Sequence, residues 1–221
     1  TKGFLIGGTA GRTTLNGEGL QHQDGHSHLA AAVTPNIKAY DLSYGYEIAT
    51  VVHHGLIEMY EKNNDCIYYI TVENENYKHP KIPKGVSVDI VKGLYKIKST
   101  KTPIIRLLGS GPLIKETLKA ELLEKDWGIS PGVWNVTSFS ELRKDAEEID
   151  RWNLTHPKEK QKSSHLEKSL RKNNVPTVAV SDYVKMLAEQ IAPYVPGPFY
   201  SLGTDGFGRS DTRKNLRKFF E

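Results

Sequence analysis

Short apolar runs alternate with amphipathic segments along this chain, and this alternation most constrains its fold. In the first part, strand-like runs at 36–41 and 66–72 flank a stretch at 44–60 that has helical spacing. Its apolar residues recur three or four positions apart: Ile48, Val51, Val52, Leu56 and Met59. Strand, helix and strand in this order predict a parallel sheet covered by helices.

The second part repeats the order of strand, turn and helix. The predicted strands are 104–108, 133–136, 176–180 and 199–202. The predicted helices are 112–125, a helix capped by Ser138 or Ser140, a helix from 181 through 188, and a final helix after the turn 203–210. We therefore predict an α/β chain of two units, with mostly parallel sheets flanked by helices.

Two stretches interrupt this pattern. Prolines, a glycine and scattered lysines predict a linker over 79–102, with a short strand at 93–97 inside it. The stretch 158–174 is rich in lysine and polar residues, and we expect it to be exposed. The carboxylates at 73–76, just before the linker, are interpreted as a solvated turn rather than as catalytic groups.

Composition narrows the class of protein. The 221 residues are 38% hydrophobic and 25% charged, which is typical of a soluble globular protein. The net charge of +4 is spread along the chain, so it favours solubility over nucleic-acid binding. No apolar run is long enough to span a bilayer, and no secretory signal is visible. The single cysteine, Cys66, excludes an internal disulfide and suits a cytoplasmic protein, where it is predicted to be a small buried hydrophobe.

The two ends of the chain are unusual. It opens on Thr1 without an initiator methionine, and it stops after the aromatic pair 219–220. We expect it to be a fragment of a longer protein.

The run 17–28, GEGLQHQDGHSH, carries the densest chemistry. It places three histidines, two carboxylates and three glycines in twelve residues. The glycines disfavour a helix, so the run is predicted to be a polar loop. Histidine moves protons near neutral pH, and a neighbouring carboxylate can orient it or shift its pKa. Proton transfer or substrate binding is therefore the favoured interpretation.

Other interpretations of the chain's polar motifs stay open at this point. His22, Asp24, His26 and His28 are ligand types for zinc or iron, although the chain has no His-Glu-x-x-His and no cysteine pair. A surface loop without function is the remaining alternative for this run. The turn 109–111, Gly-Ser-Gly, follows a predicted strand but is neither a dinucleotide-binding motif nor a P-loop, so a plain strand-to-helix turn is favoured.

The run 17–28 resembles the corresponding loop of thiamine-diphosphate-dependent, transketolase-like enzymes. It is most similar to that of the first component of homodimeric bacterial pyruvate dehydrogenase complexes. Further stretches fit the same family over nearly the whole chain: GFLIGGT at 3–9, YYIT at 68–71 with NENY at 74–77, LLGSG at 107–111, VTSF at 136–139, RWN at 151–153 and LGTDGFGRSD at 202–211.

The resemblance implies a layout and a site. Residues 1–78 correspond to the later part of a pyrimidine-binding domain, 79–102 to the linker, and 103–221 to a transketolase C-terminal-like domain, incomplete at its end. That last domain is implied to support the dimer and to carry little direct chemistry. Glu18 and His22 are implied to face the thiazolium carbon and the substrate, with His22 the first candidate. Asp24, His26 and His28 are implied to lie near the substrate or to support the loop through hydrogen bonds to the backbone.

The resemblance also implies cofactors and partners. The family binds thiamine diphosphate and Mg²⁺ through a Gly-Asp-Gly motif, which is absent from this chain, so the metal ligands and the glutamate that activates the cofactor are expected upstream of Thr1. The implied reaction is oxidative decarboxylation of pyruvate with acetyl transfer to the lipoyl domain of dihydrolipoyl acetyltransferase, by a cytoplasmic homodimer. We expect the fragment alone to be inactive and to contact neither nucleic acid nor membrane.

Three other functions are weighed against this one. The first is a transketolase-like enzyme that acts on a different 2-keto acid or on a sugar. No arginine lies near 73–77 to bind a sugar phosphate, which favours a short keto acid. The second is a non-catalytic fragment that serves dimerisation or regulation, and the third is a metal hydrolase that uses the histidine loop.

Overall fold

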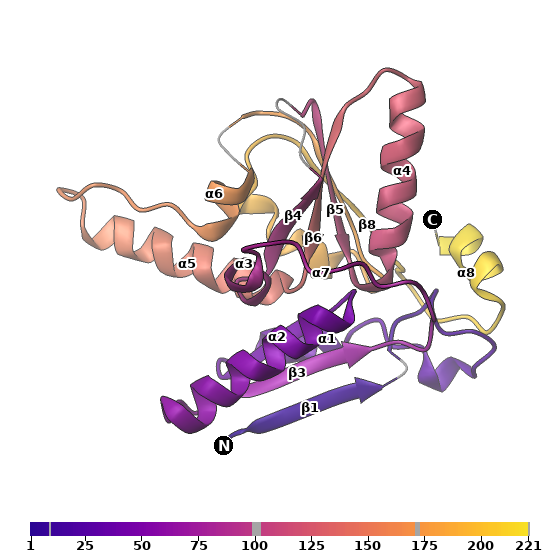
Figure 1. Cartoon of the computed structure of the whole chain (residues 1–221), viewed down its shortest axis with the longest axis horizontal. Coiled ribbons are helices and arrows are strands. Elements are labelled where there is room, and N and C mark those ends of the chain that lie inside the picture. The colour runs from indigo at the N-terminus through magenta and orange to yellow at the C-terminus, as the bar shows by residue number, and fades with distance from the viewer. Residues whose placement is uncertain (9, 99–102, 171–172, 221) are drawn as a thin grey trace.

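The chain forms two sheets, each flanked by helices (Figure 1). A computed structural model describes residues 1–8, 10–98, 103–170 and 173–220. Thr9 of the first family-like stretch, residues 99–102 of the predicted linker, and residues 171–172 of the stretch predicted to be exposed lie outside the described residues.

The first sheet has three strands, all parallel. They are β1 (Gly3–Gly8), β2 (Ile37–Asp41) and β3 (Ile67–Val72), in the order β1-β3-β2. Helix α1 (Ser27–Ala32) precedes β2, and α2 (Gly45–Leu56) links β2 to β3, ending in a wider π-type turn, η2 (Ile57–Glu61). The helical spacing at 44–60 correctly predicted α2. Its apolar face packs on a core that includes Val51, Met59 and Tyr68, and Cys66 is buried beside that core as predicted.

The second sheet has five strands. They are β4 (Leu94–Lys98), β5 (Ile105–Ser110), β6 (Pro131–Val136), β7 (Thr177–Val180) and β8 (Phe199–Leu202), in the order β4-β6-β5-β7-β8. Only β4 runs antiparallel to its neighbour, so the predicted class of mostly parallel α/β sheets is confirmed.

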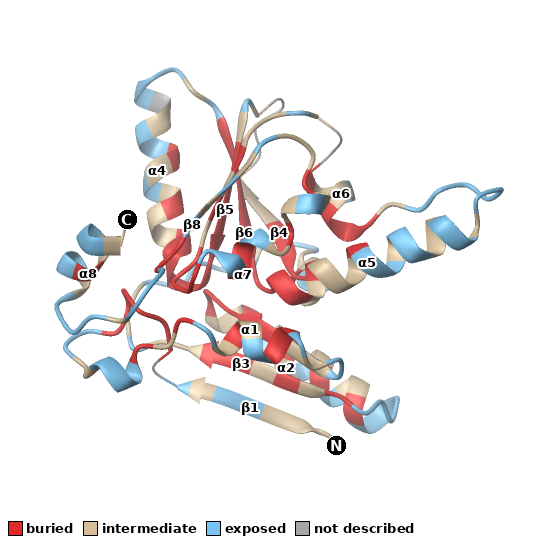
Figure 2. Ribbon diagram, turned by 180° about the vertical axis from the view of Figure 1, so that it is seen from behind, coloured by how far each residue is buried: buried red, intermediate tan, exposed pale blue. Residues whose placement is uncertain are grey.

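The remaining helices come after β3 in the chain. They are α3 (Ser87–Val91), α4 (Ile114–Asp126), α5 (Phe139–Thr155), α6 (His165–Leu170), α7 (Met186–Glu189) and α8 (Arg213–Phe220), with 3-10 turns η3 (Gly111–Leu113) and η4 (Ala192–Tyr194). Ser138 caps α5 by accepting a hydrogen bond from the Glu141 amide at 3.1 Å, as one of the two predicted caps. Burial is concentrated in β5 and β6 (Figure 2). Among the described residues, no helix combines the length and the apolar character needed to cross a membrane.

Part of the predicted linker is built into the second sheet. Residues 87–98 form α3 and β4, and the strand expected at 93–97 is present as β4. Leu94 packs into the core of the second sheet, whereas Tyr95 packs into that of the first. Gly93 turns the chain between α3 and β4 with a φ of +102°, and a Cβ there would lie 2.5 Å from the Ser138 carbonyl oxygen. Strand β4 therefore contributes a buried side chain to each of the two cores, which a plain linker would not do.

The stretch at 158–174 is predicted to be exposed, and this is wrong for the buried side of its segment 164–170. Helix α6 lies there, with Ser164, Leu166 and Leu170 buried. His165 is also buried and its Nε2 lies 2.8 Å from the Leu94 carbonyl oxygen. The abundance of lysine concealed a short amphipathic helix, whose apolar face is covered by the core of the second sheet.

Candidate active site

Glu18 and His22 lie on a loop at the protein surface. We call residues 17–23 the arch; it includes the 3-10 turn Leu20–His22, labelled η1. The arch opens at Gly17, whose φ of +72° is readily adopted only by glycine. The His22 amide donates to the Gly19 carbonyl at 3.0 Å, which closes the turn. The His22 side chain is exposed and that of Glu18 is partly exposed, so both remain accessible to a ligand.

Asp24 organises the start of α1. Its Oδ1 accepts hydrogen bonds from the backbone amides of His26, at 3.0 Å, and Ser27, at 2.9 Å. Its Oδ2 accepts from the Ser27 hydroxyl. These bonds give Asp24 the loop-supporting geometry that was the alternative to a direct role. His26 occupies the position before the first turn of α1, and its side chain is exposed.

His28 points into the protein rather than to the arch. It is 4% exposed, and its ring packs against those of Tyr69 and Tyr183 with centroids 5.3 and 4.7 Å apart. Its Nε2 lies 2.9 Å from the Thr71 hydroxyl. Burial lowers the pKa of His28, which keeps the ring neutral at pH 7.

Thr71 connects His28 to Asp41, which ends β2. Asp41 in turn lies close to Glu73, which follows β3. The Thr71 hydroxyl donates to Asp41 Oδ1 at 3.1 Å, and the Ser110 hydroxyl donates to Asp41 Oδ2 at 2.8 Å. Burial and the neighbouring Asp41 raise the pKa of Glu73 well above its usual range. The prediction of a solvated turn is therefore wrong for Glu73, whose Oε1 is buried.

Glu75 departs from the solvated-turn prediction as well. Its carboxylate pairs with Lys115 at 2.6 Å and with Arg217 at 2.7 Å, and its side chain is 13% exposed. It therefore ties the segment after β3 to α4 and α8. Both carboxylates are covered because the second unit packs over this segment, which local sequence does not reveal.

Asp182, after β7, holds the turn that precedes the arch. It is fully buried and accepts hydrogen bonds from the amides of Arg12, Thr13 and Thr14 at 2.7–3.0 Å. Both threonine hydroxyls also donate to it, each at 2.6 Å. Burial raises the pKa of Asp182, and these bonds act against that rise. Such a carboxylate is a structural anchor because its acceptor sites are already occupied.

A second buried cluster, which we call the joint, fastens α2 to the second sheet. Its members are Ser43, Tyr44, Glu47, Tyr95 and Asn135. Glu47 is fully buried and accepts from the Ser43 amide at 2.7 Å, from the Tyr44 amide at 3.0 Å and from the Asn135 side-chain amide at 2.6 Å. It also accepts from the Tyr95 hydroxyl. Burial raises the pKa of Glu47 to about 7, and the hydrogen bonds oppose this rise.

The five predicted residues therefore do not form one cluster. Glu18 and His22 share the exposed arch, Asp24 and His26 stand at the start of α1, and His28 is interior. Across the described part of the chain, no group of three His, Cys, Asp or Glu is arranged to hold a metal ion. The histidine run 17–28 therefore presents no such ligand group within the described residues.

Sequence reasoning missed Asp41, Glu73 and Asp182. One signal could have found them: Asp41 ends a predicted strand, Glu73 directly follows one, and Asp182 lies two residues after one. In parallel α/β sheets, the carboxyl ends of strands are where ligands bind. The acidic residues at these positions therefore merited the same attention as the histidines.

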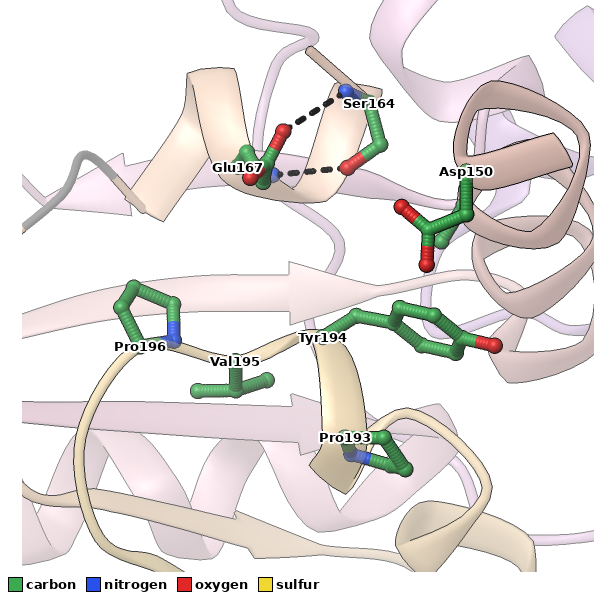
Figure 3. A pocket seen from close by; sticks show the side chains of 8 residues that line it. Asp150, Ser164, Glu167, Pro193, Tyr194, Val195 and Pro196 are labelled. Atoms are coloured by element: carbon green, nitrogen blue, oxygen red, sulfur yellow. Dashed lines mark hydrogen bonds between the residues drawn. The ribbon is translucent and has the colours of Figure 1, made fainter. Parts of the chain in front are cut away.

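Two surface hollows are lined by residues outside the arch. One of about 380 Å³ is lined by Asp150, Ser164, Glu167 and residues 193–196 (Figure 3). Ser164 and Glu167 bond to each other there, through the Glu167 amide at 3.2 Å and the Ser164 amide at 3.1 Å, as in a helix cap. A second hollow, of similar volume, lies between β3 and α2 and is lined by Glu73, Tyr44, Tyr77 and His79, among others. None of the five predicted residues lines either hollow.

Two family models match this chain. The pyruvate dehydrogenase E1 component middle domain matches residues 1–80, and the transketolase-like C-terminal domain matches residues 93–221. The chain is 51% identical to the pyruvate dehydrogenase E1 component of Cupriavidus necator over 226 aligned positions, which cover 100% of this chain. It is 52% identical to that of Pseudomonas aeruginosa over 99% of this chain, and 49% identical to that of Escherichia coli over 100%. In each case it spans only 25% of the relative.

Solved structures share the fold. A transketolase from Pichia stipitis superposes with a TM-score of 0.73 at 17% identity, over 99% of this chain and 28% of that one. A transketolase from Campylobacter jejuni gives a TM-score of 0.71 at 18% identity, over 98% of this chain and 29% of that one. At these identities the likeness concerns the fold alone.

Proposed function

Because this chain belongs to the transketolase-like family of pyruvate dehydrogenase E1 components, we propose that it is part of an enzyme that decarboxylates pyruvate. The decarboxylation is oxidative: the disulfide of the lipoyl group on dihydrolipoyl acetyltransferase oxidises the two-carbon unit and takes it up as an acetyl thioester, while its other sulfur becomes a thiol. About 50% identity to proteins named for this activity, over the whole chain, carries the proposal. The chain spans a quarter of those relatives, so the activity is proposed for the protein that carries it.

The proposed cofactor is thiamine diphosphate with Mg²⁺, an electron sink for the carbanion left by decarboxylation. The chain has no Gly-Asp-Gly motif, and no three His, Cys, Asp or Glu are grouped to hold a metal ion among the described residues, so we propose that the diphosphate and its metal are held elsewhere in the protein. The proposed domains are a pyrimidine-binding part over 1–78, a connection over 79–102 and a C-terminal domain over 103–221. We further propose a homodimer in the cytoplasm.

Within this chain, we assign the chemistry to the arch. His22 is exposed and can bring a ring nitrogen to the keto oxygen of the substrate, on which charge would develop as the carbonyl carbon is attacked, and donate a hydrogen bond or a proton to it. Glu18 lies four residues away on the same arch and can orient that ring or the substrate. Asp24 holds the start of α1, directly after the arch, through the backbone amide of His26, and His28 packs in the interior as a neutral ring against Thr71.

The test is activity of the protein that carries this chain, supplied with pyruvate, thiamine diphosphate and Mg²⁺. We expect CO₂ release and acetylation of a lipoyl domain. His22→Ala should lower the rate about 10²-fold to 10⁴-fold, the usual contribution of one acid–base group. Gln21→Ala, the exposed neighbour on the same turn, serves as the matched control and should leave the rate unchanged. Equal rates for the two variants would remove His22 from the mechanism.

The alternatives give different results in the same assay. Turnover of a sugar phosphate or a longer keto acid in preference to pyruvate would indicate another transketolase-like enzyme. A protein without turnover of any of these would indicate a dimerisation or regulatory role. Residues 1–221 alone should bind thiamine diphosphate weakly or not at all; tight, magnesium-dependent binding by calorimetry would contradict the placement of its ligands.

A further inference from the structure

The arch is fastened at both ends to one segment near the end of the chain, residues 209–213. At its start, the Gly17 amide donates to the Asp211 carbonyl at 3.0 Å. At its end, the Gln23 side-chain oxygen accepts from the Arg209 amide at 2.7 Å. Glu18 and His22 lie between these two points. Figures 1 and 2 both place α8, which follows this segment, beside the loop that contains η1.

Gln23 is the side chain that makes the second fastening. It is 8% exposed although it directly follows the exposed His22. Its Nε2 donates to the Arg12 carbonyl at 3.1 Å, while its oxygen accepts from Arg209. The segment approaches so closely that a Cβ on Gly208 would lie 2.5 Å from the Gln23 Cβ. One buried amide thus connects the arch to the turn before it and to the segment 209–213.

The segment is itself held in place. The Arg213 amide donates to the Asn16 side chain at 3.2 Å, and its guanidinium donates to the Thr14 carbonyl at 2.7 Å. The same guanidinium reaches the Asn74 carbonyl at 3.1 Å. A fastening of this kind restrains the arch only if its far end is rigid, and these bonds supply that rigidity.

We propose that Gln23 is a positioning residue, which uses the segment 209–213 to hold Glu18 and His22 in their working arrangement. This inference rests on the proposed function for its catalytic meaning. It assigns the C-terminal unit a part in the chemistry through the placement of the arch, beyond the support of a dimer. Gln23 acts on the reaction through His22 and does not touch the substrate itself.

The experiment compares Gln23→Ala with Gln21→Ala in the protein that carries this chain. These residues flank His22, but Gln21 is exposed and no hydrogen bond of its side chain is present among the described residues. For Gln23→Ala we expect hydrogen exchange at the Gly17 and His22 amides to accelerate about tenfold, because two hydrogen bonds are lost. We expect kcat to fall about tenfold with KM for pyruvate nearly unchanged, because misplaced groups slow the chemical step.

A graded variant separates positioning from general stability. Gln23→Asn keeps the side-chain amide but shortens it by one methylene, so both hydrogen bonds are weakened rather than removed, and its kcat and its arch exchange should lie between those of the wild type and Gln23→Ala. If Gln23→Ala does not fold, Gln23→Asn against Gln21→Ala decides the question. The proposal would be overturned if the Gln23 variant and Gln21→Ala had equal kcat and equal hydrogen exchange at the Gly17 and His22 amides. It would also be overturned if the Gln23 variant accelerated exchange throughout the chain.

The two proposals fail in different ways. A wild-type protein without pyruvate decarboxylation overturns the proposed function, while the exchange of the Gly17 and His22 amides still decides whether Gln23 holds the arch. The converse result is an active enzyme in which substitution of Gln23 changes neither kcat nor hydrogen exchange at the Gly17 and His22 amides. That result would leave the proposed function standing and overturn the role of Gln23.

Discussion

The arch and the joint each contain a glutamate, but the arch leaves Glu18 partly exposed and the joint buries Glu47. In the arch, Glu18 and His22 are accessible, and the segment is held by bonds at its two ends. In the joint, Glu47 is fully buried, and its carboxylate receives four hydrogen bonds. A carboxylate that is proposed to orient a substrate or a histidine ring needs unoccupied acceptor sites, whereas one that holds two units together needs those sites filled. Substitutions should therefore cost function in the arch and stability in the joint.

The largest expected effect is in the joint. Glu47→Ala would leave the Ser43 and Tyr44 amides and the Asn135 side chain buried without their acceptor, and should lower the free energy of unfolding by about 3 kcal/mol or more. Urea unfolding measures it. Glu148→Ala, an exposed glutamate of α5, is the control and should change little. Similar midpoints for both variants would show that the joint contributes little to stability.

The joint should also make stability depend on pH. Burial raises the pKa of Glu47 from 4.5 to about 7, so the folded state binds its proton more tightly than the unfolded state does. Its contribution is full below about pH 4.5 and is lost as the pH rises through about 7, by roughly 3 kcal/mol in all. Unfolding free energies of wild type and Glu47→Gln at about pH 5 and pH 8 measure this, and the variant should lose the decline. Parallel pH profiles would contradict it.

A smaller effect is expected where the arch meets α1. Asp24→Ala removes the acceptor of the His26 and Ser27 amides, and should lower the free energy of unfolding by about 1 kcal/mol. Thermal unfolding measures the change. Asp24→Asn keeps one acceptor oxygen and should lose less, so an equal loss in both variants would mean that the charge, rather than the hydrogen bonds, matters.

The smallest effect on stability is expected at His22. His22→Ala should change the free energy of unfolding by no more than about 0.5 kcal/mol, since the ring is exposed. Chemical denaturation checks this on the same preparation whose activity is assayed. A large loss of stability would mean that the ring packs against something, and that any loss of activity could not be assigned to proton transfer.

Most of the secondary structure could be predicted from local pattern. The periodic apolar residues of α2 and the run at 66–72 correspond to α2 and β3 within a residue or two. Short helices were the failures, because α1, α3 and α6 have at most six residues and too few turns to show a period. Their apolar faces are defined by what covers them, as the burial of Leu166 in the lysine-rich stretch illustrates.

In the candidate site, too, local sequence predicted some features and missed those that depend on distant contacts. Sequence pattern located the run 17–28 and, through the resemblance, singled out Glu18 and His22, a choice that stays a prediction. It could not separate His28 from them, because exposure depends on Tyr69 and Tyr183, the second of which is 155 positions away along the chain. Nor could it reveal Gln23 as a fastening, since its partner Arg209 is 186 residues distant.

The sequence by itself determined the order of strands and helices, the family and the loop to which we assign the chemistry, because each can be read from neighbouring residues. Only the tertiary structure decided which ionisable groups are exposed and which are buried. Burial sets the pKa of Glu47, Glu73 and His28, and it is produced by contacts between segments far apart in the chain. The arch owes its shape to such contacts too, since the segment that holds it comes from the opposite end of the protein.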